Sequence, residues 1–249
     1  MKMTARQSLA QCRMILATDF SKKPMKMLKR VKHHVIDGDE IFPDEAKEIK
    51  TNAKYIGEAK PKKLGKILRK IAKRGQLGLA VELMDELGLL EHVLPEVAAA
   101  KGVARGFPGE KEGDVFVHLV EAAKNAPSTV EGQFSALFHD VAKPRTGELR
   151  KDDIKFPGHA KIGAVMAREI LERLKFDDDT IDKVETAVAE HGKMKELVDA
   201  DDDELWDFID EVGPDNVMDV INTSKATEVQ DDDTDAAKTV ERRVRKLMK

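Results

Sequence analysis

Apolar residues recur along most of this chain at intervals of three and four positions, the period of a helix that buries one face. In the first part of the chain, the pattern predicts helices that begin near Thr4, Pro24, Pro43 and Pro61, followed by another over 76–87. Proline favours the first turn of a helix because its missing N–H would have no helical partner there. We therefore expect five amphipathic helices before residue 90.

The second part of the chain continues this periodicity with one interruption. Helical segments are predicted at 114–126, 131–142, 158–175, 178–191, 203–212 and 214–223, with a last helix after Asp231. The pattern fails between Pro144 and Pro157, where 148–156 is expected to form a loop or a short hairpin. A Gly- and Pro-rich loop at 102–113 separates the two parts. We place a domain boundary there, between residues 1–101 and residues 114–249.

Composition supports helices packed on helices. Aromatic residues make up only 4% of the chain, whereas Leu, Ala, Lys and Glu are abundant. The sequence thus predicts an all-α fold. The only cysteine, Cys12, rules out an intramolecular disulfide and a thiolate zinc cluster. With neither a targeting segment nor an apolar run long enough for a membrane span, we expect a cytoplasmic protein.

Charge is unevenly distributed. Residues 1–75 hold 20 Lys and Arg against 8 Asp and Glu, and the rest of the chain holds 23 against 39. The helices predicted after Pro24 and Pro61 each carry a basic face that suits nucleic-acid phosphates. The candidate RNA-binding residues on these faces are Lys26, Lys29, Arg30, Lys66, Arg69, Lys70 and Lys73. A solvated helix face would show the same pattern, and the scarcity of aromatic residues argues against base stacking.

Four of the seven histidines form a candidate metal site. An adjacent pair, His139 and Asp140, lies in the apolar run 136–143, and His118, His159 and His191 lie on three other predicted helices. Imidazole and carboxylate groups that converge from separate elements are the usual ligands of an ion that activates water. Adjacent residues on a helix point about 100° apart, so both can reach one ion only near a helix end. A single histidine beside an apolar run is more often a packed side chain, and only the combination indicates a site.

Two cations accompany the pair. Lys143 follows His139 by four positions and therefore lies on the same helical face, where its ammonium group can hold a phosphate oxygen. Arg145 is a second candidate for that role. These two cations indicate a site that binds a phosphate group.

The order of these motifs resembles the HD-domain metal-dependent phosphohydrolases. The segments that carry the resemblance are 114–118, 136–144, 156–159 with Gly163, 173–175 and 190–191. More narrowly, they are similar to the HD module of bacterial CCA-adding tRNA nucleotidyltransferases, and 24–32, 63–68 and 86–96 resemble the helical neck and body of those enzymes. The resemblance implies an all-α HD-type domain that binds a divalent ion such as Mg, Mn, Ni, Co or Fe.

Two departures from the family pattern bear on function. The sequence has no counterpart of the nucleotidyltransferase head with its carboxylate pair and Gly-rich loop, so nucleotide addition by this chain alone is not expected. The family's last metal ligand is an Asp, and here Thr227 takes that position, followed by Glu228. A hydroxyl is a poor ligand for a divalent ion, so metal affinity should fall unless Glu228 substitutes.

The sequence therefore supports two functions. The first is metal-dependent hydrolysis of a nucleotide, a cyclic phosphate or another phosphoester, with His118, His139 and Asp140 holding one ion and His159 with His191 holding a second ion or the phosphate. In the second, the HD site is degenerate and the chain binds RNA such as tRNA, or serves as the helical partner of a separate nucleotidyltransferase head. No membrane partner is expected, and the sequence does not fix the oligomeric state.

Overall fold

The computed structural model describes residues 19–105, 113–150, 153–227 and 234–249. Within these ranges, the chain is built of helices with one two-stranded sheet, which confirms the predicted all-α class. The helix expected near Thr4 lies outside the described residues. No helix in the described ranges is long and apolar enough to cross a membrane.

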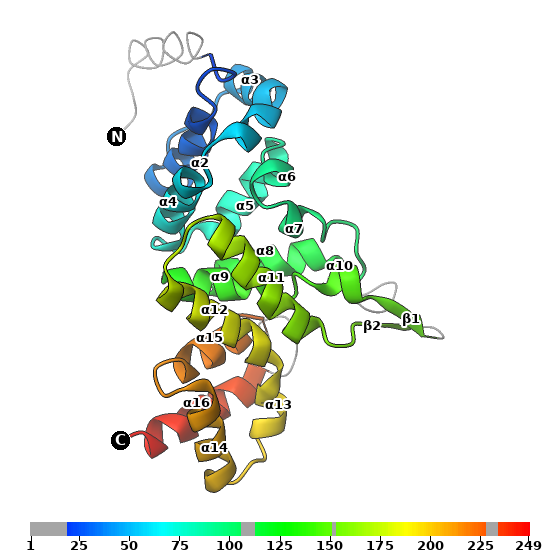
Figure 1. Cartoon of the computed structure of the whole chain (residues 1–249), viewed down its shortest axis with the longest axis vertical. Coiled ribbons are helices and arrows are strands. Elements are labelled where there is room, and N and C mark those ends of the chain that lie inside the picture. The colour runs from blue at the N-terminus through cyan, green and yellow to red at the C-terminus, as the bar shows by residue number, and fades with distance from the viewer. Residues whose placement is uncertain (1–18, 106–112, 151–152, 228–233) are drawn as a thin grey trace.

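The N-terminal helices form one end of an elongated molecule, drawn in blue and cyan in Figure 1. Their bounds are α2 Met25–Asp37, α3 Pro43–Asn52, the 3-10 helix η1 Ala53–Glu58, α4 Pro61–Ala72, α5 Leu77–Glu86, α6 Leu90–Val93 and α7 Pro95–Ala98. Helix α4 buries Leu64, Ile67, Leu68 and Ile71 on one face, as its periodicity predicts. This face belongs to a hydrophobic core that continues into the central helices.

The central helices lie in the middle of the molecule (Figure 1), and the four histidines of the candidate metal site lie on them or directly after them. Their bounds are α8 Val115–Asn125, α9 Val130–Phe138, α10 Lys143–Thr146, α11 His159–Arg173 and α12 Asp178–Glu190. Strands β1 Glu148–Arg150 and β2 Asp153–Lys155 pair antiparallel between α10 and α11, with Leu149 opposite Ile154. A short hairpin was one of the two conformations expected for this segment.

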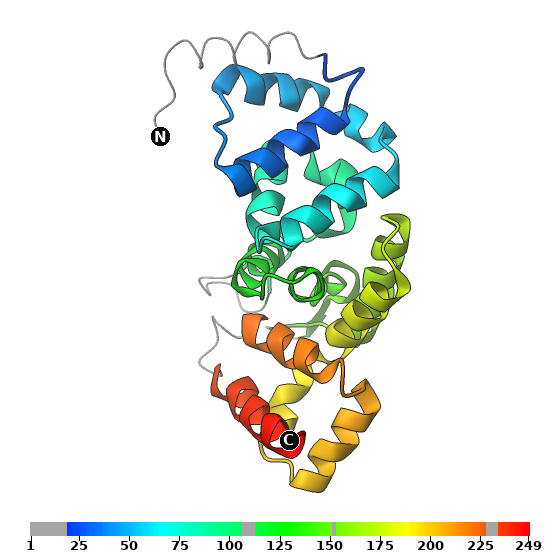
Figure 2. The ribbon, with the colours of Figure 1, turned by 90° about the vertical axis from the view of Figure 1, so that its left-hand side faces the viewer.

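The C-terminal helices pack around a second apolar cluster at the opposite end of the molecule. They are the 3-10 helix η2 His191–Lys193, α13 Met194–Leu197, α14 Asp202–Val212, α15 Val217–Thr227 and α16 Thr234–Leu247. Figure 2 shows α15, in orange, between the central helices and the rest of this cluster. Because α15 also packs against α8, α9 and α12, its last residues reach the region where the histidines gather.

Close contacts join the N-terminal helices to the central ones. A Cβ on Gly65 of α4 would lie 2.2 Å from the carbonyl oxygen of Leu174, so only glycine permits this approach. On the same face, Arg69 pairs with Asp177 at 2.7 Å. Apolar packing also continues across the predicted boundary at 102–113, because one buried cluster extends from Phe20 to Val188. The domain boundary between residues 1–101 and residues 114–249 stays a prediction.

Candidate metal centre

The His-Asp pair lies just beyond a helix end. We expected helix through residue 142, but α9 ends at Phe138, and that boundary was wrong. Tight turns follow, with the Val141 and Lys143 amides donating to the Phe138 and Asp140 carbonyls. Pro144 explains the break, because its ring would collide with the carbonyl of Asp140 in a continuous helix. The pair is therefore not tied to the 100° spacing of a helix, and both side chains face the same interior space.

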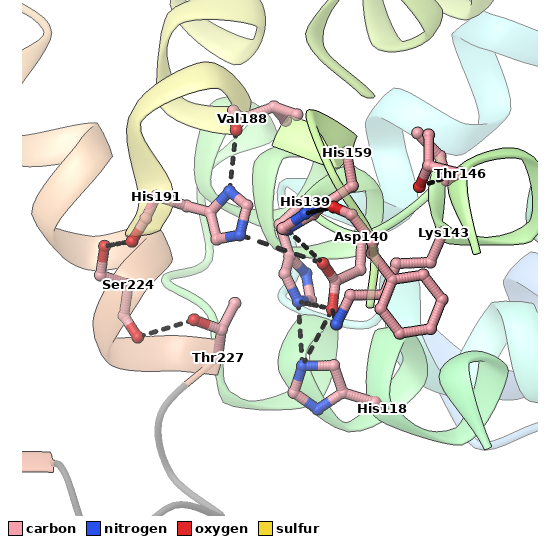
Figure 3. A network of polar contacts seen from close by, with 12 residues as sticks. His118, His139, Asp140, Lys143, Thr146, His159, Val188, His191, Ser224 and Thr227 are labelled. Carbon is pink, nitrogen blue, oxygen red and sulfur yellow. Dashed lines mark hydrogen bonds and ion pairs between the residues drawn. The ribbon is translucent and has the colours of Figure 1, made fainter. Parts of the chain in front are cut away.

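The structure brings the four histidines together around Asp140 (Figure 3). One carboxylate oxygen, Oδ2, lies 3.2 Å from His139 Nε2 and 3.8 Å from His118 Nε2. The other oxygen, Oδ1, lies 3.2 Å from His159 Nε2 and 4.0 Å from His191 Nε2. The cluster thus consists of two three-residue groups, His118–His139–Asp140 and Asp140–His159–His191, that share one carboxylate.

Backbone carbonyls fix the orientation of three imidazoles. The Nδ1–H groups of His139, His159 and His191 donate to carbonyl oxygens of Ala136, Phe156 and Val188, in each case 2.8 Å away and three residues earlier. Since a carbonyl can only accept, Nδ1 carries the proton in each ring and a neutral ring keeps its lone pair on Nε2. Those lone pairs face the interior, the arrangement that metal-binding histidines require.

Without a cation, the burial of this cluster is energetically unfavourable. Oδ1 of Asp140 is buried and accepts no hydrogen bond from the described residues, and Nε2 of His118 and of His139 lie only 2.9 Å apart. A buried oxygen without a partner costs free energy, and four imidazole nitrogens lie within 4.0 Å of this carboxylate. The donor set therefore fits a divalent cation.

Two pKa shifts agree with that interpretation. Burial by itself would raise the pKa of Asp140, but His139, His159 and Lys143 outweigh it and hold this pKa well below its ordinary value. Burial, reinforced by the neighbouring His139, lowers the pKa of His191 to about 4. At neutral pH the cluster thus offers an ionised carboxylate and a neutral imidazole, the protonation states that bind metals.

Lys143 and Arg145 differ in position. The Lys143 ammonium lies 2.7 Å from Oδ2 of Asp140 and 5.0 Å from the centre of the Phe156 ring, and it lines the cavity beside the histidines. Arg145 is exposed on α10 and is absent from the lining of that cavity. Of the two predicted phosphate ligands, the structure brings only Lys143 to the cluster.

The cavity has a volume of about 200 Å³ and opens beside the histidines. Its lining residues are Arg105, His118, His139, Asp140, Lys143, His159, His191, Gly192, Lys195 and Thr227. Sequence reasoning missed Arg105 and Lys195, which come from the segment before α8 and from α13. No local pattern marks them, because only the packing of distant segments brings them to the cavity.

Thr227 closes one side of the cavity. It is the last residue of α15, is 8% exposed, and its hydroxyl donates to the carbonyl of Ser224 at 2.9 Å. The Ser224 hydroxyl in turn donates to the carbonyl of His191. A neutral side chain thus lies at the position where the family resemblance implies a carboxylate ligand. Glu228, the possible substitute, lies outside the described residues.

The basic faces of α2 and α4 contain two arginines with roles inside the fold. Arg30 is half-buried and pairs with Glu45 at 2.5 Å and with Asp39 at 3.4 Å, whereas Arg69 pairs with Asp177. The other candidate RNA-binding residues, Lys26, Lys29, Lys66, Lys70 and Lys73, are exposed. The lysines of these faces are therefore exposed to solvent, whereas Arg30 and Arg69 form ion pairs within the fold.

Comparisons with known proteins agree with this geometry. Residues 115–212 match the HD domain family. The chain is 34% identical over 128 residues to the CC-adding tRNA nucleotidyltransferase of Thermus thermophilus, a match covering 49% of this chain and 29% of that protein. It is 33% identical over 115 residues to the A-adding tRNA nucleotidyltransferase of Deinococcus radiodurans, covering 43% of this chain and 26% of that protein.

A third relative, the multifunctional CCA protein of Halorhodospira halophila, is 35% identical over 98 residues, covering 38% of this chain and 23% of that protein. The chain spans less than a third of the length of each of these relatives. Helices α8, α9, α11, α12 and α14, together with the His-Asp cluster, lie in the matched range. The chain therefore resembles the HD domain family over residues 115–212, and it is similar to tRNA nucleotidyltransferases over up to about half of its length.

Proposed function

We propose that this protein is a metal-dependent phosphohydrolase that acts on a nucleotide, a cyclic phosphate or another phosphoester. The observation that carries the proposal is the pair of three-residue groups sharing Asp140 at the end of a cavity lined by cations. Histidine and carboxylate groups in this arrangement can hold one or two divalent ions. The HD domain match supports the same class of chemistry.

The residues have separate roles in this proposal. His118, His139 and Asp140 hold the primary ion, and His159 with His191 hold a second ion or the phosphate. When bound there, a divalent ion lowers the pKa of a coordinated water and offsets charge on the phosphoryl oxygens. Lys143 keeps the carboxylate ionised and adds positive charge at the cavity. Because its Nζ is 2.7 Å from Asp140, it orients that carboxylate as well.

Ligand chemistry narrows the choice of metal. Four imidazoles and one carboxylate suit Fe, Co, Ni or Mn better than Mg, which prefers oxygen ligands. Thr227 contributes no negative charge, so affinity should be modest. Among Mg, Mn, Ni, Co and Fe, we therefore favour the last four.

The test is metal-dependent release of phosphate from a panel of nucleotides, cyclic nucleotides and simple phosphomonoesters. We expect turnover with Mn, Co, Ni or Fe, its loss on chelation, and a fall of at least about 1,000-fold in His139→Ala. The control is His92→Ala, because His92 lies on α6 and is absent from the lining of this cavity. Absence of metal-dependent turnover across the whole panel would contradict the proposal.

A second function is favoured by the exposed lysines of α2 and α4. Among the described residues, Lys66, Lys70 and Lys73 pair with no carboxylate, and they follow one another at helical spacing. Such a face suits the phosphates of RNA, and the similar relatives are named tRNA nucleotidyltransferases. We propose that residues 1–101 bind tRNA or another RNA while residues 114–249 carry the HD site.

A further inference from the structure

The end of α12 determines where His191 points. Helix α12 ends at Glu190, and His191 begins the 3-10 helix η2, so the α-helical hydrogen-bond pattern stops at this residue. Carbonyl groups at the end of a helix lack the partners that the helix interior provides, and they are satisfied by donors from elsewhere. The position of His191 therefore depends on what its backbone meets in the surrounding structure.

Ser224 of α15 supplies such a donor. Its hydroxyl donates to the carbonyl oxygen of His191, a residue 33 positions earlier, and the side chain is fully buried (Figure 3). Serine in a helix commonly donates to the carbonyl four residues earlier, which here is that of Val220. That oxygen is 3.2 Å away and is farther from the hydroxyl than the His191 oxygen is. Since a hydroxyl has one proton, the contact with His191 is the favoured one.

A second hydrogen bond fixes the imidazole of His191. Its Nδ1–H donates to the carbonyl of Val188 at 2.8 Å, and its Nε2 lies 4.0 Å from Oδ1 of Asp140. The Val188 carbonyl thus sets the rotation of the ring, while Ser224 holds the backbone that carries the ring. Because the ring moves with its backbone, a shift of the His191 carbonyl would change the direction of Nε2 toward Asp140.

Helix α15 is a firm support for this contact. It packs against α8, α9 and α12, and it buries Val217, Val220 and Ile221 in the C-terminal apolar cluster. Ser224 lies outside residues 115–212, the range that matches the HD domain family. A residue beyond the matched range therefore contacts one of the histidines within it.

We propose that Ser224 is a positioning residue for the metal centre. By holding the backbone of His191, it directs Nε2 of that ring into the group Asp140–His159–His191. This inference rests on the proposed metal-dependent function and assigns to α15 a part in ion binding that is separate from the position of Thr227. Ser224 itself does not contact the ion.

Calorimetric titration of the full chain with Mn tests the role through affinity. We expect Ser224→Ala to weaken Mn binding about tenfold, the usual effect of removing a group that orients a ligand. The matched control is Thr223→Val, because Thr223 is equally buried and its hydroxyl donates within α15, to the carbonyl of Asp219 at 2.8 Å. This variant loses a buried hydroxyl without affecting His191, so its Mn affinity should be unchanged. Equal Mn affinities in Ser224→Ala and the unaltered protein would overturn the proposal.

A double-mutant cycle separates positioning from a general loss of stability. If Ser224 acts through His191, Ser224→Ala should cause no further loss of Mn affinity in a protein that already carries His191→Ala. Losses that simply multiply in the double variant would overturn the proposal, because Ser224 would then act independently of His191.

Nuclear magnetic resonance of the imidazole N–H groups tests the same contact without metal. We expect Ser224→Ala to speed exchange of the His191 Nδ1–H with water at least about tenfold, since the ring loses its fixed support. Exchange at His139 should not change, because its Nδ1–H donates to Ala136. An exchange rate at His191 that is the same with and without the Ser224 hydroxyl would overturn the proposal.

The two proposals fail in different ways. A protein that binds no Mn, but in which exchange at His191 still depends on Ser224, contradicts the metal-dependent function and supports the role of Ser224 in orienting the ring. A protein that binds Mn equally well with and without the hydroxyl contradicts only the role of Ser224.

Discussion

The histidine cluster and the lysine face of α4 both concentrate charge, but they do so in opposite surroundings. Around Asp140, the polar groups are buried or half-buried, four imidazole nitrogens lie within 4.0 Å of the carboxylate oxygens, and backbone carbonyls orient three of the rings. On α4, the ammonium groups of Lys66, Lys70 and Lys73 are exposed, and no carboxylate among the described residues pairs with them. The first region can position an ion, and the second can only provide a diffuse positive field.

Because of this difference, the effects of substitutions in the cluster should depend on geometry, whereas those on the α4 face should depend on charge alone. In the cluster, a single atom out of place changes the ligands available to a cation. On the α4 face, the contribution of each lysine is screened by salt and can be replaced by another cation. Arg69 belongs to neither group, because its guanidinium is used to join α4 to α12.

Removing the exposed charge is the strongest test of the lysine face. We expect Lys66→Gln, Lys70→Gln and Lys73→Gln together to weaken RNA binding at least about tenfold and to make the plot of log affinity against log salt shallower by about 2. Filter binding at several salt concentrations measures both quantities. The matched control replaces the same lysines by arginine, and metal-dependent turnover should be unchanged in every variant. RNA binding that is unaffected by the triple neutral variant contradicts the RNA proposal.

Thr227→Asp tests the missing carboxylate at the cluster. The new side chain should bind a cation beside His191, so Mn affinity measured by calorimetry should increase about tenfold. Without metal, the buried carboxylate should lower Tm, and added Mn should restore it. Thr227→Asn has nearly the same shape without the charge and serves as the control. Equal Mn affinities in the two variants would show that position 227 does not reach the ion.

The smallest expected effect is at Arg69. Its ion pair with Asp177 is partly exposed, so Arg69→Gln should reduce the free energy of unfolding by no more than about 1 kcal/mol and Tm by about 2–4 °C. RNA affinity should not change, in contrast to the lysine variants. A loss of RNA affinity without a loss of Tm would show instead that Arg69 belongs to the RNA-binding face.

The ion pair between Arg69 and Asp177 should also make the stability of the protein depend on pH. Arg69 and the backbone amide of Thr180 hold the pKa of Asp177 below its ordinary value. A carboxylate whose pKa is lower in the folded state contributes stability above its unfolded pKa of about 4 and loses that contribution as the pH falls below it. The difference in Tm between Arg69→Gln and the unaltered protein should therefore be full at pH 7 and shrink toward pH 3.

Much of the fold follows from local patterns. Periodicity places α8, α11 and α12 within a few residues of their observed bounds and places the starts of α2 and α4 near Pro24 and Pro61, because each helix has one apolar face that must be buried. The errors fall at helix ends that periodicity alone does not determine, one before Pro144 and one where tertiary packing decides the bounds. The predicted segment 214–223 is observed as Val217–Thr227, since the last turn of α15 packs against the central helices.

The candidate site was predictable only in part. The four histidines and Asp140 follow motifs along the sequence, and the structure brings these five residues together. Arg105 and Lys195 have no such motif, because their relation to the cluster exists only after α13 and the segment before α8 have packed around it. For the same reason, no local pattern indicates that Arg30 is neutralised by Glu45, a residue 15 positions away.

The repeated contact from Nδ1–H to the carbonyl three residues earlier has a kinetic consequence. His139, His159 and His191 are already turned toward the interior by the backbone, so arrival of an ion requires little rearrangement of the chain. Exchange of one ion for another should then be limited by passage through the cavity mouth and by the breaking of ligand bonds. In such a centre, the supply of metals in the surroundings has a strong influence on which one is bound.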